Sequence, residues 1–299
     1  MKRIKKLSKW ADYAHYKYKD ASEFSNSRFP NGVHTIPING TNIDILTYDR
    51  RSPVTLIVFH AALSKSATRI PAFKGRGLAE DSNFNLISLA DPTLEMGDLD
   101  VAWFLGNEHT GYLPDLLAPL LHEILRTFET QNTIIFGSSG GGFAAVNFGS
   151  YFPDSIVLAA VPRLSLVDKP VEKLEKYASI AFSDQTREDQ FNAILSRIGG
   201  GRLSEKLADE GLNFDLCIYH NLGDKTFADH HVMPFISKLE NSERLFTKAE
   251  WFGSGHVIIP AAPYRQVLSH FGSSSDQKTS ILSAGFVPVL RDFPGNPHI

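Results

Sequence analysis

The segment that most constrains the fold is residues 133–153, TIIFGSSGGGFAAVNFGSYFP. A short apolar run ends at Phe136, the sequence GSSGG follows at 137–141, and a stretch of small and apolar residues comes next. This order predicts a buried strand that turns sharply into a helix. A G-x-S-x-G turn holds its central side chain at the apex in a strained backbone conformation, and the flanking glycines remove Cβ atoms that would collide. The segment therefore predicts that Ser139 is a nucleophile.

Ser138 is a weaker candidate than Ser139, because only the central position of the motif sits at the apex. Ser138 is expected to point into the sheet edge or to pack beside it, where it is a candidate for substrate contact. The alternative for the whole motif is a glycine-rich loop before a core helix. The strand pattern before the motif and the helix pattern after it favour the catalytic interpretation.

Strand and helix patterns alternate along most of the chain. Residues 33–48 read as a hairpin that turns at Asn39-Gly40. Buried strands are expected at 54–60, 84–90, 133–136, 155–161, 214–222 and 244–252, and helices at 115–129, 142–151, 228–240 and 261–271. Alternation of this kind predicts an α/β fold, with a mostly parallel central sheet flanked by helices and the catalytic side chains beyond the carboxyl ends of the strands.

Three further segments do not show this alternation. Residues 93–113 are expected to be irregular with a short helix, and the tail from Gly272 to lie over the surface. Residues 163–213 are charged and helix-prone, and they lack a buried-strand pattern. We therefore expect residues 1–299 to form one domain, in which 163–213 is a small helical cap insertion over the sheet.

Charge and cysteine content narrow the functional classes. The net charge is -3, so no overall basic field favours nucleic acid. The single cysteine, Cys217, lies in an apolar run and is expected to be a buried core thiol that cannot form an internal disulfide. These features favour a cytoplasmic protein over a secreted, disulfide-stabilised one.

The first 20 residues are basic but lack the continuous apolar region of a signal peptide. They are compatible with an amphipathic helix carrying Ile4, Leu7, Trp10 and Tyr13 or Ala14 on one face. Such a helix would dock on the domain or make peripheral contact with an anionic membrane surface. Residues 130–153 lack charge, but their Gly, Ser and Asn content and the internal turn argue against a membrane span.

A catalytic serine needs an orienting acid and a base. Asp224 follows the strand predicted at 214–222 and is the favoured acid, although an aspartate there also suits a helix N-cap. Asp229 competes with it but falls inside the next predicted helix. His256, in the segment GSGH after the last predicted strand, is the favoured base, the alternative being a solvent-facing loop histidine. The chain order serine, acid, histidine is the one that accompanies a nucleophile on a strand-to-helix turn of this kind.

An oxyanion hole needs two backbone N–H donors. Gly140, directly after the nucleophile, is expected to supply one. Ala61 or Ala62, in the loop after the strand at 54–60, is expected to supply the other, and His60 to shape that loop.

A metal site is the rival interpretation, because Asp224, Asp229, His230 and His231 lie within eight residues of one another. Adjacent histidines on a helix point in different directions, and neither H-E-x-x-H nor another zinc spacing is present. Residues 140–142 are glycines after a strand, but neither phosphate-loop pattern fits them. We therefore expect no metal and no cofactor.

Several segments together resemble a known family: FHAA at 59–62, SLADPTL at 88–94, VAWFLG at 101–106, FGSSGGGFAAV at 136–146, NLGD at 221–224 and GSGH at 253–256. They are similar to bacterial α/β-hydrolase proteins of the accessory secretion type, which are encoded near surface glycoproteins and glycosyltransferases. The resemblance spans about residues 40–270. The chain departs from the family pattern at 161–163, where Val-Pro-Arg replaces Asn-Pro-Gln.

This resemblance implies an α/β-hydrolase fold with Ser139 as nucleophile, Asp224 as acid and His256 as base. It also implies that Trp103 and Phe104 border the site, and that glycosyltransferase or export machinery is a partner.

The predicted function is that of a serine hydrolase acting on an ester through an acyl-Ser139 intermediate, as a carboxylesterase or deacetylase. The substrate would be a small acyl ester or an acylated glycan. One alternative is an O-acyltransferase that modifies surface glycan or glycoprotein. Another is a non-catalytic scaffold in a glycosylation or export complex.

Overall fold

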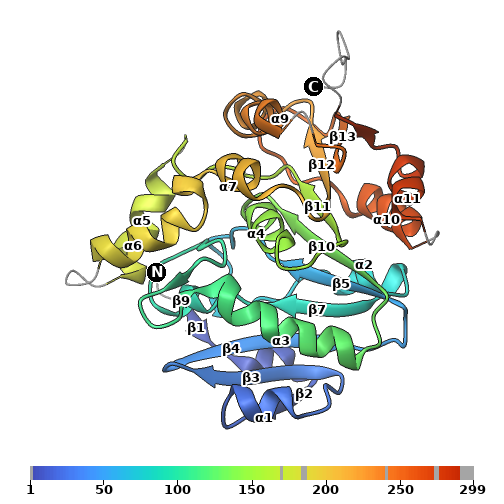
Figure 1. Cartoon of the computed structure of the whole chain (residues 1–299). Coiled ribbons are helices and arrows are strands. Elements are labelled where there is room, and N and C mark those ends of the chain that lie inside the picture. The colour runs from blue at the N-terminus through green and yellow to red at the C-terminus, as the bar shows by residue number, and fades with distance from the viewer. Residues whose placement is uncertain (1–2, 169–170, 183–186, 240–241, 273–275, 290–299) are drawn as a thin grey trace.

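The structure is a computed structural model that describes residues 3–168, 171–182, 187–239, 242–272 and 276–289. A ten-stranded sheet crosses the molecule in the order β14-β13-β12-β11-β10-β5-β7-β4-β3-β2 (Figure 1). Its parallel centre consists of β7 (Asn85–Leu89), β5 (Val54–Phe59), β10 (Asn132–Ser138), β11 (Ile156–Ala160), β12 (Asp215–Asn221) and β13 (Leu245–Glu250). The predicted α/β class and mostly parallel sheet are confirmed.

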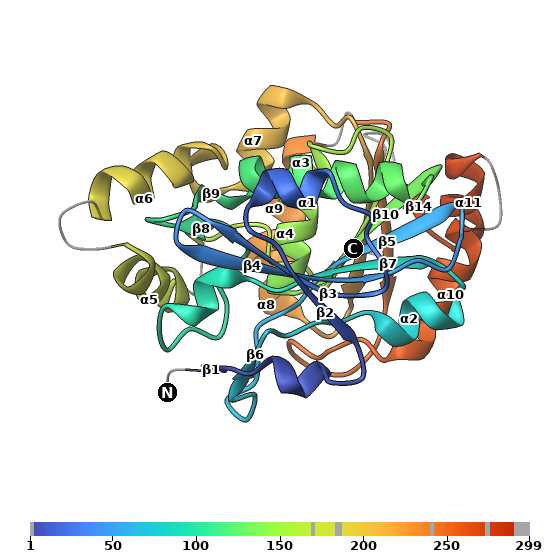
Figure 2. The same cartoon turned by 90° about the horizontal axis from the view of Figure 1, so that it is seen from below.

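Helices cover both faces of this sheet because its central strands are apolar on both faces. On β5, Ile57 and Phe59 join the core on one face, while Leu56 and Val58 join the core on the other. The first core takes in α3 (Leu113–Thr127) and α4 (Gly140–Gly149). The second takes in α2 (Arg76–Asp81), α10 (Ala261–Phe271) and α11 (Gln277–Ser283), and Figure 2 shows the layers from below.

The predicted hairpin is present as β3 (Gly32–Ile38) and β4 (Thr41–Tyr48), which pair antiparallel. Its turn lies at Asn39 and Gly40, both with positive φ, as an Asn-Gly turn requires. β4 also pairs antiparallel with β7, so the hairpin extends one side of the parallel sheet.

The prediction of an amphipathic helix at the N-terminus is wrong. Residues from Ile4 onward form β1 (Ile4–Lys5), the 3₁₀ turn Leu7–Trp10 and β2 (Ala14–Lys17). β1 pairs with β6 (Arg69–Ile70), and β2 pairs with β3 at the edge of the large sheet. Trp10 packs on the second core, and its Nε1 donates to the carbonyl of Pro71. The segment therefore docks on the domain in an extended form, while membrane contact stays a prediction.

The chain between β7 and α3 is irregular as expected, with a 3₁₀ turn at Pro92–Glu95 and a small hairpin of β8 (Gly106–Asn107) and β9 (Gly111–Tyr112). The prediction that the tail from Gly272 lies over the surface is wrong for its described part. There α11 packs Ile281 into the second core, and β14 (Val287–Pro288) pairs antiparallel with β13. Residues 290–299 lie outside the described residues.

Helices fill the segment between β11 and β12. They are α5 (Glu172–Ala181), α6 (Arg187–Ser196), the 3₁₀ turn Gly199–Gly201 and α7 (Leu203–Glu210), shown in yellow in Figure 1. That these helices act as a cap over the site stays a prediction. Among the described residues, no helix combines the length and the apolar character needed to cross a membrane.

The buried histidine of β3, His34, is expected to lower the free energy of unfolding in mild acid. Its Nε2–H donates to the carbonyl of Pro30 and its Nδ1 accepts from the Tyr18 hydroxyl, a neutral arrangement. Burial lowers the pKa of His34 to about 4. Because this folded-state pKa lies below the unfolded value, the unfolded chain takes up the proton first, and stability present above pH 6.5 is lost as pH falls.

We expect this residue to make the free energy of unfolding about 2 kcal/mol higher at pH 7 than at pH 5. Chemical denaturation at the two pH values tests this, with His34→Gln as the variant that retains hydrogen bonding but does not titrate. An equal pH dependence of wild type and His34→Gln would contradict the expectation.

Candidate active site

The turn between β10 and α4 is as tight as the motif predicts. Ser139 has φ 53° and ψ −116°, a strained conformation for a residue with a side chain. A Cβ atom on Gly137 would lie 1.9 Å from the carbonyl oxygen of Gly141, and one on Gly141 would lie 2.5 Å from that of Phe59. Glycine is therefore required on both sides of Ser139.

Three side chains from distant parts of the chain form a hydrogen-bonded relay. The Oγ of Ser139 lies 2.8 Å from Nε2 of His256, and Nδ1 of His256 lies 2.6 Å from Oδ2 of Asp224. Asp224 is an acceptor only, so Nδ1 of the imidazole donates to it and Nε2 is left to accept the serine proton. The side chain of Asp224 is 1% exposed, which shields this hydrogen bond from water.

Asp224 also fulfils the alternative expected for it. Its Oδ1 accepts from the backbone N–H of Phe227 and caps α8 (Lys225–Phe227) while Oδ2 faces His256. The competing Asp229 lies in the π-helical turn Ala228–Val232 and is exposed. The two carboxylates are therefore in different positions, and only Asp224 is hydrogen-bonded to the histidine.

The expected oxyanion donors flank the turn. Gly140 is the first residue of α4, so its N–H has no acceptor within the helix. The chain at Phe59 and His60 packs on Gly141, which brings the loop that follows beside Ser139. In the described part of the chain, neither the Ala61 nor the Ala62 N–H donates to a protein acceptor.

His60 holds this loop. Its Nδ1–H donates to the Ala61 carbonyl at 2.8 Å, and its Nε2 accepts from the Asp91 N–H at 3.2 Å. Burial lowers the pKa of His60 to about 4, so the ring is neutral at pH 7. Because a trans peptide places C=O and N–H on opposite sides, the bond to Ala61 also orients the N–H of Ala62.

The three expected substrate contacts lie in different places. Trp103 lies against the turn, with its Nε1 3.4 Å from the position of a Cβ on Gly140, and is almost fully buried. Ser138 shares a face of β10 with Phe136, on the side of α10. The roles of Trp103 and Ser138 in substrate binding stay predictions.

Phe104 lies in the core, against the residue that precedes the Ala61 loop, and its role in substrate binding also stays a prediction. Its N–H donates to the carboxylate of buried Asp91, and its ring packs on Phe59 and His60. Trp103 and Phe104 both have positive φ, so the chain reverses there and directs Phe104 inward.

Sequence reasoning missed Asn221, the last residue of β12. Its Oδ1 accepts from the N–H groups of Gly223 and Phe252, and its Nδ2 donates to the carbonyls of Gly253 and Gly255. All four bonds lie between 2.9 and 3.1 Å, and the residue is fully buried. Asn221 thus joins the loop that carries Asp224 to the loop that carries His256.

Replacing Asn221 by alanine is expected to lower kcat/KM by about 10²-fold, because small displacements of catalytic groups have effects of that size. The loss should nearly vanish in a His256→Ala background, where there is no imidazole left to position. Ester hydrolysis by the two single variants and the double variant measures this coupling. Asn213→Ala, at an exposed asparagine far from the relay, is the control. A full loss of about 10²-fold in the His256→Ala background would contradict a positioning role.

Phe227 is a second residue without a sequence signal. Its ring stacks on the His256 imidazole with centroids 3.8 Å apart and planes inclined by 20°. The ring of His231 also packs edge-on with Phe227, at 4.7 Å between centroids. The imidazole of His256 is therefore held by Asp224 at one nitrogen and by an aromatic ring against its plane.

The residues that suggested a metal do not converge. His230 is exposed and His231 is buried, on the same π-helical turn. Across the described ranges there is no group of three or more His, Cys, Asp or Glu side chains placed to hold a metal ion.

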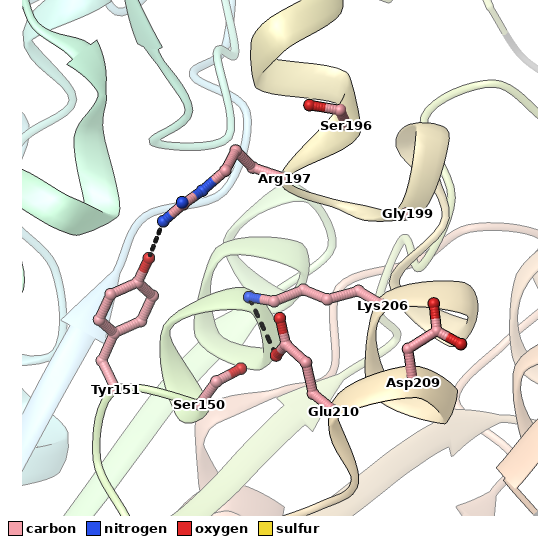
Figure 3. A pocket seen from close by; sticks show the side chains of 8 residues that line it. All are labelled: Ser150, Tyr151, Ser196, Arg197, Gly199, Lys206, Asp209 and Glu210. Carbon is pink, nitrogen blue, oxygen red and sulfur yellow. Dashed lines mark hydrogen bonds and ion pairs between the residues drawn. The ribbon is translucent and has the colours of Figure 1, made fainter.

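A polar pocket of about 360 Å³ lies away from these residues, between the end of α4 and the helices α6 and α7 (Figure 3). Lys206 extends across it from α7 and bonds to Asn147, while Arg197 is paired with Asp115. Both cations already have protein partners, and none of the expected site residues lines this pocket.

No protein-family model matches the chain, and no curated protein sequence matches it significantly. Solved structures do match. A capsule O-acetyltransferase of Neisseria meningitidis serogroup A has a TM-score of 0.58 at 18% identity, over 85% of this chain and 99% of that one. An esterase of Pyrococcus furiosus has a TM-score of 0.53 at 13% identity, over 85% of this chain and 92% of that one. An S-formylglutathione hydrolase of Agrobacterium tumefaciens has a TM-score of 0.50 at 14% identity, over 86% of this chain and 95% of that one. The chain has the α/β-hydrolase fold, as predicted.

Proposed function

We propose that this protein is a serine hydrolase that cleaves carboxylic esters through an acyl-Ser139 intermediate. The observation that carries the proposal is the relay from Ser139 through His256 to buried Asp224, with distances of 2.8 and 2.6 Å. The strained backbone of Ser139 and the position of the Gly140 N–H at the start of α4 support it.

In the first half of the reaction, Nε2 of His256 takes the proton of Ser139 as Oγ attacks the ester carbonyl carbon. The C=O electrons move onto oxygen, and the N–H groups of Gly140 and of Ala61 or Ala62 stabilise this negative charge. The tetrahedral species collapses, and His256 gives its proton to the departing alkoxide, which leaves as the alcohol. Asp224 stabilises the imidazolium between these two transfers.

In the second half, an acceptor hydroxyl loses its proton to His256 and attacks the acyl carbon. The bond between the acyl carbon and Oγ then breaks, and His256 returns the proton to Oγ, which restores Ser139. Water as the acceptor yields the carboxylic acid, and the protein is then a carboxylesterase or deacetylase. The test is the hydrolysis of p-nitrophenyl acetate by wild type and Ser139→Ala, which should differ in kcat by about 10⁴- to 10⁶-fold.

O-acyl transfer to a hydroxyl of a glycan or glycoprotein is the second candidate. The capsule O-acetyltransferase favours it, since its similarity extends over 99% of that chain, and another of its structures, a complex with CoA, matches with a TM-score of 0.56 at 17% identity. The same acyl-serine chemistry serves both reactions, with a sugar hydroxyl replacing water. Transfer of acetyl from acetyl-CoA to an added glycan, followed by mass spectrometry, distinguishes the two.

A non-catalytic scaffold is the remaining alternative. Under this proposal the partner would be glycosyltransferase or export machinery, as the sequence resemblance implies. A chain that had lost catalysis would have no need to keep the Ser139, His256 and Asp224 side chains in hydrogen-bonding register. Their arrangement therefore favours an enzyme over a scaffold.

A further inference from the structure

A hollow of about 200 Å³ lies at the carboxyl edge of the sheet, in the segments that follow β11 and β12. We call it the His231 hollow. It is lined by Leu164, Ser165, Asp168, Arg202, Ser204, Glu205, His230, His231, Pro234, Phe235 and Lys238. One wall is the strand-like contact of residues 164–166 with 201–203, and the opposite wall is the start of α9 (Met233–Leu239) and the turn before it.

The His231 hollow adjoins the relay from two directions. On one side, the N–H of Arg163 donates to the carbonyl of Ser139 at 3.1 Å, and the lining begins at the next residue. On the other side, the ring of Phe227 contacts both His256 and His231. On each side, therefore, a single residue separates the lining of the hollow from a residue of the relay.

The charges along the hollow are balanced. Arg202 forms an ion pair with Asp168 at 3.1 Å, and Lys238 forms one with Glu205 at 2.9 Å. The hydroxyls of Ser165 and Ser204 belong to the same lining. Such a surface suits a neutral, hydrogen-bonding group, because an alkyl chain would desolvate the charged pairs and an ionic group would meet an equal charge of its own sign.

His231 is the unusual member of this lining. It is 1% exposed, and neither ring nitrogen has a hydrogen-bond partner in the residues that the structure describes. Burial lowers the pKa of His231 to about 4, so the imidazole is neutral at pH 7 and offers one donor and one acceptor. Buried polar groups are normally satisfied, so this ring has a hydrogen bond still to make.

We propose that the His231 hollow binds the alcohol portion of the ester, and that His231 forms a hydrogen bond with a hydroxyl group of that alcohol. The substrate class is then an ester of a neutral polyhydroxy alcohol. This inference rests on the proposed ester cleavage at Ser139 and adds the selection of the alcohol. A hydroxyl both donates and accepts, as does the neutral imidazole.

The experiment compares 6-O-acetylglucose with cyclohexylmethyl acetate, two acetates whose alcohols are of similar shape but differ in hydroxyl groups. Wild type should prefer the sugar acetate in kcat/KM. His231→Phe, which keeps a ring but loses both nitrogens, should reduce that preference by about 10- to 100-fold. His231→Gln, which retains a donor and an acceptor, should keep most of it. The readout is the ratio of the two kcat/KM values within each protein, so an equal change in the turnover of both acetates leaves it unaltered.

Two results separate this inference from the proposed function. If hydrolysis of p-nitrophenyl acetate depends on Ser139 but His231→Phe keeps the wild-type preference for the sugar acetate, the proposal for the His231 hollow is overturned and the proposed ester cleavage is not. Absence of any Ser139-dependent turnover would overturn both.

If His231→Phe fails to fold, nitrogen-15 spectra of histidine-labelled Ser139→Ala protein give the answer. The His231 ring signals should shift on addition of 6-O-acetylglucose and not of cyclohexylmethyl acetate. Equal responses to the two acetates would overturn the inference.

Discussion

Replacing Ser139 by alanine is expected to lower kcat for p-nitrophenyl acetate by about 10⁴- to 10⁶-fold. The hydroxyl is the only group in the relay placed to form the acyl intermediate, and water added at its position lacks the preorganised contact with Nε2 of His256. The remaining rate should come from the N–H groups around the turn, which still stabilise negative charge on the ester oxygen.

The matched control is Ser150→Ala, at the opposite end of the same helix. Its hydroxyl has no hydrogen-bond partner among the described residues, so the change should leave both activity and stability nearly unaltered. Steady-state kinetics with thermal unfolding of both variants gives the comparison. A Ser139→Ala protein that is folded and retains more than about a tenth of the wild-type kcat would rule out Ser139 as the nucleophile.

The second large effect is expected at Asp224. An asparagine there keeps the shape of the side chain and its cap on α8, but loses the charge that holds the Nδ1–H tautomer of His256. Nε2 of the histidine would then carry the proton and no longer accept the one from Ser139. We expect kcat to fall by about 10⁴-fold, with KM little changed.

Asp229→Asn is the control for this prediction, because Asp229 lies on the turn that follows α8 and does not bond to His256. Its activity should remain within about twofold of wild type, as for most substitutions away from a buried network. The same kinetic assay at pH 7 measures both variants. A larger loss in Asp229→Asn than in Asp224→Asn would reverse the assignment of the acid.

The parts of the candidate site whose positions could be predicted from sequence are those with a local signal. Ser139 has glycines on either side and sits between a strand and a helix pattern, and each of these features acts within a few residues. Asp224 and His256 were placed by the strands that precede them, because parallel strands bring their carboxyl ends to one edge. The hydrogen bonds between the three then follow from the topology.

The parts that sequence missed depend on partners distant in the chain. Asn221 bonds to groups in the loop after β13, and nothing around it marks it as different from other asparagines. The apolar residues of the N-terminal segment are spaced as in an amphipathic helix. Its backbone instead forms hydrogen bonds with β3 and β6, so the segment is extended. Phe104 is turned inward by the carboxylate of Asp91, a contact that only the folded chain contains.

Covalent labelling with a fluorophosphonate, located by peptide mass spectrometry, tests the central claim most directly. The reagent reacts with a serine only where a base activates it and N–H groups stabilise the negative oxygen. We predict one adduct on Ser139 in wild type and in Ser150→Ala, none in Ser139→Ala, and much slower labelling in His256→Ala. Absence of labelling in folded wild type, or an adduct on another serine that persists in Ser139→Ala, would contradict the account.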